Sequence, residues 1–136
     1  MNELHTIHVL LANGTSHTLQ IEVATTPPWK LVVSGQGFDR KEFTGRDTFE
    51  ALIALRREIE REGGRLLCNG ARPDVRPSGM SRSMGGGRKA YILQLGRTTT
   101  LKSLVDIIGH AEKDQVGTVE EQMEFHQKWF QSLKQQ

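Results

Sequence analysis

The sequence predicts an α+β fold in which a mostly antiparallel sheet of about 5–7 strands packs against two helices, at about 47–62 and 118–134. The first third of the chain alternates apolar and polar residues with a period of two, which is typical of half-buried strands. Two later segments each open with a capping box and continue with apolar residues at helical spacing. The length of 136 residues suits a single domain, 1–136, because domains commonly have about 100–150 residues.

The first two strands are expected to form a hairpin around Asn13-Gly14, a dipeptide that favours tight turns. A two-residue loop would place the apolar Ile7 opposite the polar Gln20. A three-residue loop, 12–14, pairs Ile7 with Leu19, so that the apolar faces of the two strands agree. Because the buried face sets the register, we expect the longer loop, with its glycine left-handed in a bulge.

Five further segments are expected to be strands, because they alternate in the same way or are short and apolar. Pro27-Pro28 interrupts the pairing after the hairpin, since proline has no N–H to donate. The five segments are 29–33, 38–43, 65–69, 90–95 and 104–108.

The first predicted helix begins with a capping box, Asp47 followed three residues later by Glu50. Gly63-Gly64 ends it, because glycine tolerates the left-handed conformation of a helix cap. The charged side chains of its second half are expected to form a solvated face: Arg56, Arg57, Glu58, Glu60, Arg61 and Glu62.

The last predicted helix begins at Thr118, and Glu121 completes a second capping box. Its His126 is expected to be a hydrogen-bonded core histidine, because it falls on the apolar side of the helix. The predicted apolar stripe is Val119, Met123, Phe130 and Leu133, with Phe125 and Trp129 on its flank.

Composition and motifs exclude several classes of protein. The longest apolar run is far shorter than the ~20 residues of a membrane span, so we expect no membrane association. One cysteine, Cys68, cannot form an internal disulfide, and the N-terminus lacks the features of a signal peptide, so we expect a cytoplasmic protein. The five histidines have no metal-ligand spacing, and no nucleophile motif surrounds Cys68 or the serines. We therefore predict no catalytic residues, no metal site and no cofactor.

The segment Gly70–Arg88 is expected to be a long irregular stretch, of a length that is usually functional or disordered. From Arg72 to Lys89 it holds five positive residues and one negative residue, Asp74, a local charge of +4. The net charge of the whole chain is +2, so the remainder sums to −2. The candidate partner-binding residues are these cations with the neighbouring methionines and one tryptophan: Arg72, Arg76, Met80, Arg82, Met84, Arg88, Lys89 and Trp129.

Three interpretations of this segment remain open. It can be an ordered crossover loop packed on the sheet, whose arginines are solvated or paired with Asp74 and helix carboxylates. It can also be a loop that presents arginine and methionine anchors to another protein. It can also be a phosphate- or nucleic-acid-binding module that uses the basic, glycine-rich loop 72–89. Nucleic acid is the less favoured partner, because no phosphate-loop or dinucleotide motif is present and no aromatic residues interleave with the basic ones.

The run N-G-A-R-x-D-V-x-P-S-G-M-x-R-x-M-G-G-G-x-x-A-Y, residues 69–91, resembles a group of small bacterial proteins. These proteins are encoded beside polymorphic or type VI secreted toxins. V-D-I at 105–107 and G-T-V-E-E-Q at 117–122 are similar to the same group. The resemblance covers roughly the C-terminal two-thirds of the chain. It implies a cytoplasmic immunity protein that binds the effector domain of a cognate toxin and neutralises it without catalysis.

Overall fold

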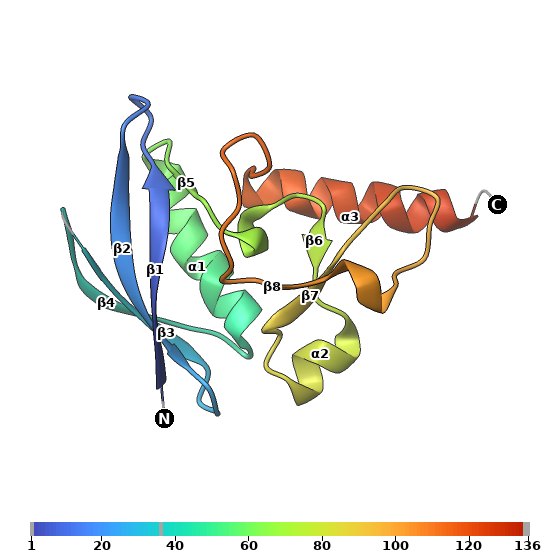
Figure 1. Ribbon diagram of the computed structural model, residues 1–136, viewed down its shortest axis with the longest axis horizontal. Helices are drawn as coiled ribbons and strands as arrows, with labels where there is room; N and C mark the ends of the chain where they lie inside the picture. Colours follow the sequence, from blue (N-terminus) through green and yellow to red (C-terminus); the bar gives the residue numbers. More distant parts are fainter. Residues whose placement is uncertain (1, 36, 135–136) are drawn as a thin grey trace.

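The computed structural model describes residues 2–35 and 37–134, which form an α+β fold with two antiparallel sheets (Figure 1). The larger sheet has five strands in the order β4-β3-β2-β1-β5, and the smaller has three in the order β6-β7-β8. The strands are β1 (Asn2–Leu10), β2 (Ser16–Ala24), β3 (Lys30–Gly35), β4 (Phe38–Thr44), β5 (Arg65–Leu66), β6 (Val75–Arg76), β7 (Lys89–Ile92) and β8 (Leu104–Asp106). The α-helices are α1 (Thr48–Arg61), α2 (Gly79–Met84) and α3 (Val119–Lys134), with 3-10 turns η1 (Asn69–Ala71) and η2 (Leu101–Ser103).

The α+β class is as predicted, and the details differ. The expected strands are divided between two sheets, and α2 is an additional helix inside the segment that was expected to be irregular. Strand β6 is only two residues long, which is too short to leave a periodic signal in the sequence. In the larger sheet β5 pairs with β1, far earlier in the chain, whereas the smaller sheet joins three strands that follow one another in the sequence.

The β1–β2 hairpin has the predicted register. Ile7 lies opposite Leu19, and the backbone N–H of Leu11 donates to the carbonyl of Thr15 across a three-residue loop at 2.8 Å. Gly14 has a φ of 88°, the left-handed conformation that the loop requires. The shared apolar face therefore fixed the register, as expected.

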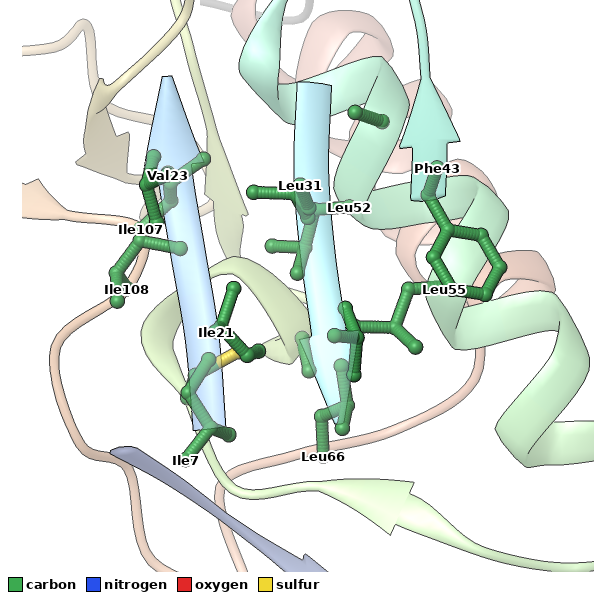
Figure 2. Packing of buried hydrophobic residues seen from close by; sticks show 14 of the residues in the cluster. Ile7, Ile21, Val23, Leu31, Phe43, Leu52, Leu55, Leu66, Ile107 and Ile108 are labelled. Carbon is green, nitrogen blue, oxygen red and sulfur yellow. The ribbon is translucent and has the colours of Figure 1, made fainter. Parts of the chain in front are cut away.

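The main core lies between the five-stranded sheet and α1 (Figure 2). Helix α1 begins at the predicted N-cap, with the Asp47 carboxylate accepting a hydrogen bond from the Glu50 N–H at 2.7 Å. The return bond of the predicted capping box differs, since Glu50 Oε1 accepts from the N–H of Arg46, one residue before the cap, at 3.3 Å. Ile107 and Ile108, directly after β8, belong to the same buried cluster, so the two sheets share one core. Its other large members are Ile7, Val9, Leu19, Ile21, Val23, Leu31, Val33, Phe43, Phe49, Leu52, Leu55, Leu66 and Val75.

Arg56 corrects the prediction of a solvated charged face on α1, because it is buried, with only 1% of its surface exposed. Its guanidinium donates to Gln122 Oε1 at 2.7 Å and to the carbonyl oxygens of Gly70, at 3.1 Å, and Gly117, at 3.3 Å. Glu60 supplies the opposite charge, with its Oε2 3.5 Å from Arg56 Nε. Burial lowers the pKa of Arg56, and the nearby Glu60 opposes that shift.

Gln122 completes this buried junction from α3. Its Nε2 lies 2.9 Å from the Gly70 carbonyl oxygen, 2.8 Å from that of Arg72 and 3.1 Å from that of Val75. Arg56 and Gln122 thus provide side-chain donors for backbone carbonyls that have been removed from water, where an unpaired acceptor is costly. The Arg56–Gln122 junction joins α1, the segment around η1 and β6, and α3.

Helix α3 corrects a second prediction, because its inward face differs from the expected apolar stripe. The capping box is present, with Glu121 N–H donating to Thr118 Oγ1 at 3.0 Å and Thr118 N–H donating to Glu121 Oε1 at 2.8 Å. Met123 and Phe130, however, are each 51% exposed. The inward face instead follows the buried residues Val119 and Gln122, because the hydrogen bonds of Gln122 hold that side of the helix against the fold.

Replacement of Arg56 by alanine should destabilise the fold by about 3–5 kcal/mol, because it leaves Glu60, Gln122 and two carbonyls without their buried partner. The matched control is Arg57→Ala, since Arg57 is the next residue and makes an exposed ion pair with Glu120 at 2.8 Å. That change should cost only about 0–1 kcal/mol. Urea unfolding of both variants measures the difference, and equal losses would contradict the role given to the junction.

Candidate functional site

The segment from Asn69 to Tyr91 is ordered into short elements: η1, β6, α2 and β7 follow one another with few residues between them. The expectation of a long irregular stretch over 70–88 is therefore wrong. Ser78 begins α2 by accepting a hydrogen bond from the Ser81 N–H at 3.0 Å. This cap is a local signal, but α2 has only six residues and no buried side chain, so it carries no apolar periodicity.

Two of the predicted cations are paired inside this region. Arg72 binds Asp74 with two parallel hydrogen bonds of 2.9 Å. Arg82 Nε donates to Asp47 Oδ2 at 2.6 Å, and its guanidinium lies 5.5 Å from the centre of the Phe49 ring. Since Asp47 is also the N-cap of α1, this ion pair fastens α2 to the start of α1.

Arg88 is the third paired cation. Its Nε donates to Asp106 Oδ1 at 2.7 Å, and its Nη2 donates to Asp106 Oδ2 at 3.1 Å and to Glu3 Oε1 at 2.9 Å. Burial raises the pKa of Asp106, but the hydrogen bonds from Arg88 and from the Ile108 N–H outweigh it, so the net pKa is lowered. Hydrogen bonding to His5 and to Arg88 lowers the pKa of Glu3. Arg88 therefore links β1 of the larger sheet to β7 and β8 of the smaller one.

The glycine run has a structural role at the same place. Gly86 and Gly87 have φ values of 68° and 72°, and the Thr48 N–H donates to the Gly86 carbonyl at 2.7 Å. A side chain at Gly86 would overlap the Trp29 ring, and one at Gly87 would press on Asp47. These glycines therefore allow the chain after α2 to lie directly against the start of α1.

Arg76 has no hydrogen bond or ion pair with any of the described residues, although it is half-buried. It lies opposite Tyr91 in the β6–β7 pair and lines a cavity of about 370 Å³. Arg82 and Trp129 line the same cavity, and the Trp129 indole N–H donates to the carbonyl of Arg97 at 2.8 Å. Lys89 is exposed, with its Nζ 4.0 Å from Asp106 Oδ2.

Met80 and Met84 are the most exposed of the predicted partner-binding residues, at 72% and 80%. Residues four apart share a helix face, and a residue two positions away points to the opposite side. The two methionines therefore face away from Arg82, which points toward Asp47. The predicted residues do not form one surface: the methionines and Lys89 face solvent, three arginines are paired internally, and Arg76 and Trp129 line the cavity.

Sequence analysis missed several residues of this cavity. Tyr91 and Leu93 come from β7 and the residue that follows it, while His126 joins Trp129 from α3. His126 was expected in the core and instead lies half-buried at the cavity wall, where burial and the charge of Arg76 lower its pKa. The Arg76–Tyr91 register and the position of α3 together bring these residues to one cavity, and neither is evident from the sequence.

The structure defines the environment of the Cys68 thiol and the placement of possible metal ligands. Cys68 is buried, and burial raises its pKa to about 11, so its thiolate is scarce at neutral pH. Within residues 2–35 and 37–134, no group of three or more His, Cys, Asp or Glu side chains is placed to hold a metal ion. Over the same residues, no helix has both the length and the apolar character needed to cross a bilayer.

Comparison with known proteins does not extend these observations, since no protein-family model and no curated protein matches the sequence.

Replacement of Arg88 by alanine should lower the stability of the fold at pH 7, because Asp106 and Glu3 lose their shared partner. Ionisation of a carboxyl group with a lowered folded-state pKa stabilises the fold above its unfolded pKa, and this stabilisation is lost as the pH falls through the folded-state pKa. The difference in free energy of unfolding between wild type and Arg88→Ala should therefore become smaller below about pH 4, which is the ordinary pKa of these carboxyl groups. Unfolding curves at several pH values between 7 and 3 test this, and a difference that stays constant would contradict it.

Cys68 should resist alkylation in the folded protein, because its thiol is both buried and held in the protonated form. Iodoacetamide at pH 8 should leave the native chain largely unmodified and should label it fully in denaturing urea. Intact-mass spectrometry distinguishes the two states. Rapid labelling of the native chain would show that Cys68 is accessible.

Proposed function

We propose that this chain is a cytoplasmic immunity protein that binds the effector domain of a cognate secreted bacterial toxin and neutralises it without catalysis. The resemblance of residues 69–91 to proteins encoded beside such toxins supports the toxin as partner. The observation that carries the binding role is the outward-facing pair Met80 and Met84 on α2. A partner that covers this pair removes apolar surface from water, which is the main driving force of most protein association.

Helix α2 is a defined platform for this pair because contacts on both sides hold it. Arg82 binds Asp47 at 2.6 Å, Ser81 Oγ donates to the Lys89 carbonyl at 2.6 Å, and the Gly87 N–H donates to the Ser81 carbonyl at 3.0 Å. A partner therefore meets methionines whose backbone is already ordered, and less conformational entropy is lost on binding. Methionine side chains adapt to irregular surfaces, and burial of each contributes about 1.5–3 kcal/mol.

Three arginines of this segment stabilise the proposed surface through ion pairs within the chain. Arg72, Arg82 and Arg88 each bind a carboxylate of the same chain, so their charges are already compensated. Phosphate or nucleic-acid binding by the loop 72–89, which the sequence leaves open, would need several free guanidinium groups, because each phosphate contact adds to the affinity. Of the four arginines in the loop, only Arg76 has no ion pair with the described residues, so these pairs do not favour binding to a nucleic-acid backbone. Lys89 remains exposed beside α2, where its positive charge can contact an acidic surface of the partner.

Replacement of both Met80 and Met84 by glutamate should weaken binding to the toxin domain by at least about tenfold, because it puts charge into the apolar contact. The matched control is Leu4→Glu, since Leu4 is 73% exposed and points to the opposite face of β1 from Glu3 and His5, which contact Arg88. The protein tested as the toxin domain is the product of the adjacent gene, and its affinity for each variant is measured by titration calorimetry. Co-expression should restore growth with wild type and the control but not with the double variant.

Two outcomes would contradict the proposal at different levels. Failure of the wild-type chain to associate with the toxin domain and to restore growth would reject the immunity function. Equal binding by wild type and the Met80→Glu, Met84→Glu variant would retain that function and would move the interface away from α2. Circular dichroism of both variants confirms that α2, which has no buried side chain, tolerates the changes.

A further inference from the structure

The cavity beside Arg76 has the dimensions and the lining of a small-molecule site. Its volume of about 370 Å³ lies within the roughly 300–1,000 Å³ of ligand pockets. One side is formed by β6 and β7, a second by the start of α2, and a third by α3. The lining includes Arg76, Arg82, Tyr91, Leu93, His126 and Trp129.

Three lining residues form an apolar wall. Tyr91 and Leu93 are two positions apart on one extended segment, so their side chains point to the same side. Trp129 faces them from α3, one helical turn after His126, and the two rings lie 5.9 Å apart. A flat or branched apolar group would be covered by this wall on more than one side.

The charge of the cavity is that of Arg76. The charge of Arg82 is compensated by Asp47 at 2.6 Å, and no acidic side chain is among the described lining residues. His126 is disposed to be neutral, because burial and the Arg76 charge both lower its pKa. The net result is one uncompensated positive charge in a concave, half-buried place, where the field on an anion is stronger than at an open surface.

Arg76 differs in this respect from every other arginine of the region. Arg56 is more deeply buried and has four partners, and Arg72, Arg82 and Arg88 each have a carboxylate. Arg76 has none among the described residues, while burial and the nearby Arg82 charge lower its pKa. A planar guanidinium with free donors is suited to a carboxylate, which it binds with two parallel hydrogen bonds.

We propose that this cavity binds a small organic monocarboxylate, with its carboxylate on Arg76 and its apolar body against Tyr91, Leu93 and Trp129. One carboxylate matches the single uncompensated charge. The site is separate from the toxin surface proposed above, because the methionines lie on the opposite face of α2 from Arg82.

The experiment titrates the full chain with benzoate and follows the Trp129 indole N–H and the His126 ring by NMR. Benzoate should bind saturably, with a Kd of about 1 mM or tighter, and should raise the pKa of His126 because it compensates Arg76. Benzyl alcohol, which lacks the charge, and inorganic phosphate, which lacks the apolar body, should each bind about tenfold more weakly or not at all. If benzyl alcohol binds as tightly as benzoate, the site is only an apolar cavity. If phosphate binds as tightly as benzoate, the site is an unselective anion site. Either result overturns the proposal.

Variants connect the binding to Arg76. Arg76→Gln should weaken benzoate binding by about tenfold or more, and the matched control Arg40→Gln, an exposed arginine on β4, should leave it unchanged. Arg76→Gln should fold, because the Arg76 side chain has no hydrogen bond or ion pair with the part of the chain that the structure describes. Arg76→Lys, which keeps the charge but loses the planar pair of donors, should give intermediate affinity. The Met80→Glu, Met84→Glu variant should bind benzoate as wild type does. Equal effects of Arg76→Gln and Arg40→Gln, or shifts that map away from Trp129 and His126, would overturn the proposal.

Discussion

The Arg56–Gln122 junction is the interaction on which the rest of the structure depends. A charged side chain from the middle of α1 and an amide from the first turn of α3 together satisfy four carbonyl oxygens, those of Gly70, Arg72, Val75 and Gly117. Without these donors the chain between β5 and α2 would have buried acceptors unpaired. The junction therefore determines where β6 begins, and through β6 the position of the smaller sheet and of the cavity.

Ion pairs hold further elements in place around the Arg56–Gln122 junction. Asp47 with Arg82 places α2 at the start of α1, and Arg88 with Asp106 and Glu3 ties the smaller sheet to β1. Most of the cations in the basic segment therefore hold parts of the same chain together. The exposed methionines, and Arg76, which has no ion pair within residues 2–35 and 37–134, are the residues to which the two proposed binding roles are assigned.

Local signals in the sequence predicted the parts of the fold that depend on neighbouring residues. The hairpin register at Ile7 and Leu19, the cap at Asp47 and the capping box at Thr118 were predicted correctly, because each depends on residues close in the chain. Predictions failed where distant segments meet. Arg56 appeared to belong to a charged face, because its hydrogen-bond partners are 14 to 66 residues away and only the Glu60 carboxylate lies on the same helix. Helix α3 turns its Gln122 inward in place of Met123 for the same reason. The cavity was missed because it needs the Arg76–Tyr91 register.

Asp47 has two tasks that the fold makes inseparable, capping α1 and holding Arg82. A chain in which the first turn of α1 has not formed lacks the anchor of α2, so Met80 and Met84, the residues of the proposed toxin surface, have no fixed position. The ability to present this surface is therefore acquired only when the central helix is complete. A truncated or partly folded copy that retains every residue of the 69–91 segment still lacks the shape that the segment has in the whole protein. Formation of the proposed surface therefore depends on the folding of α1 and its cap.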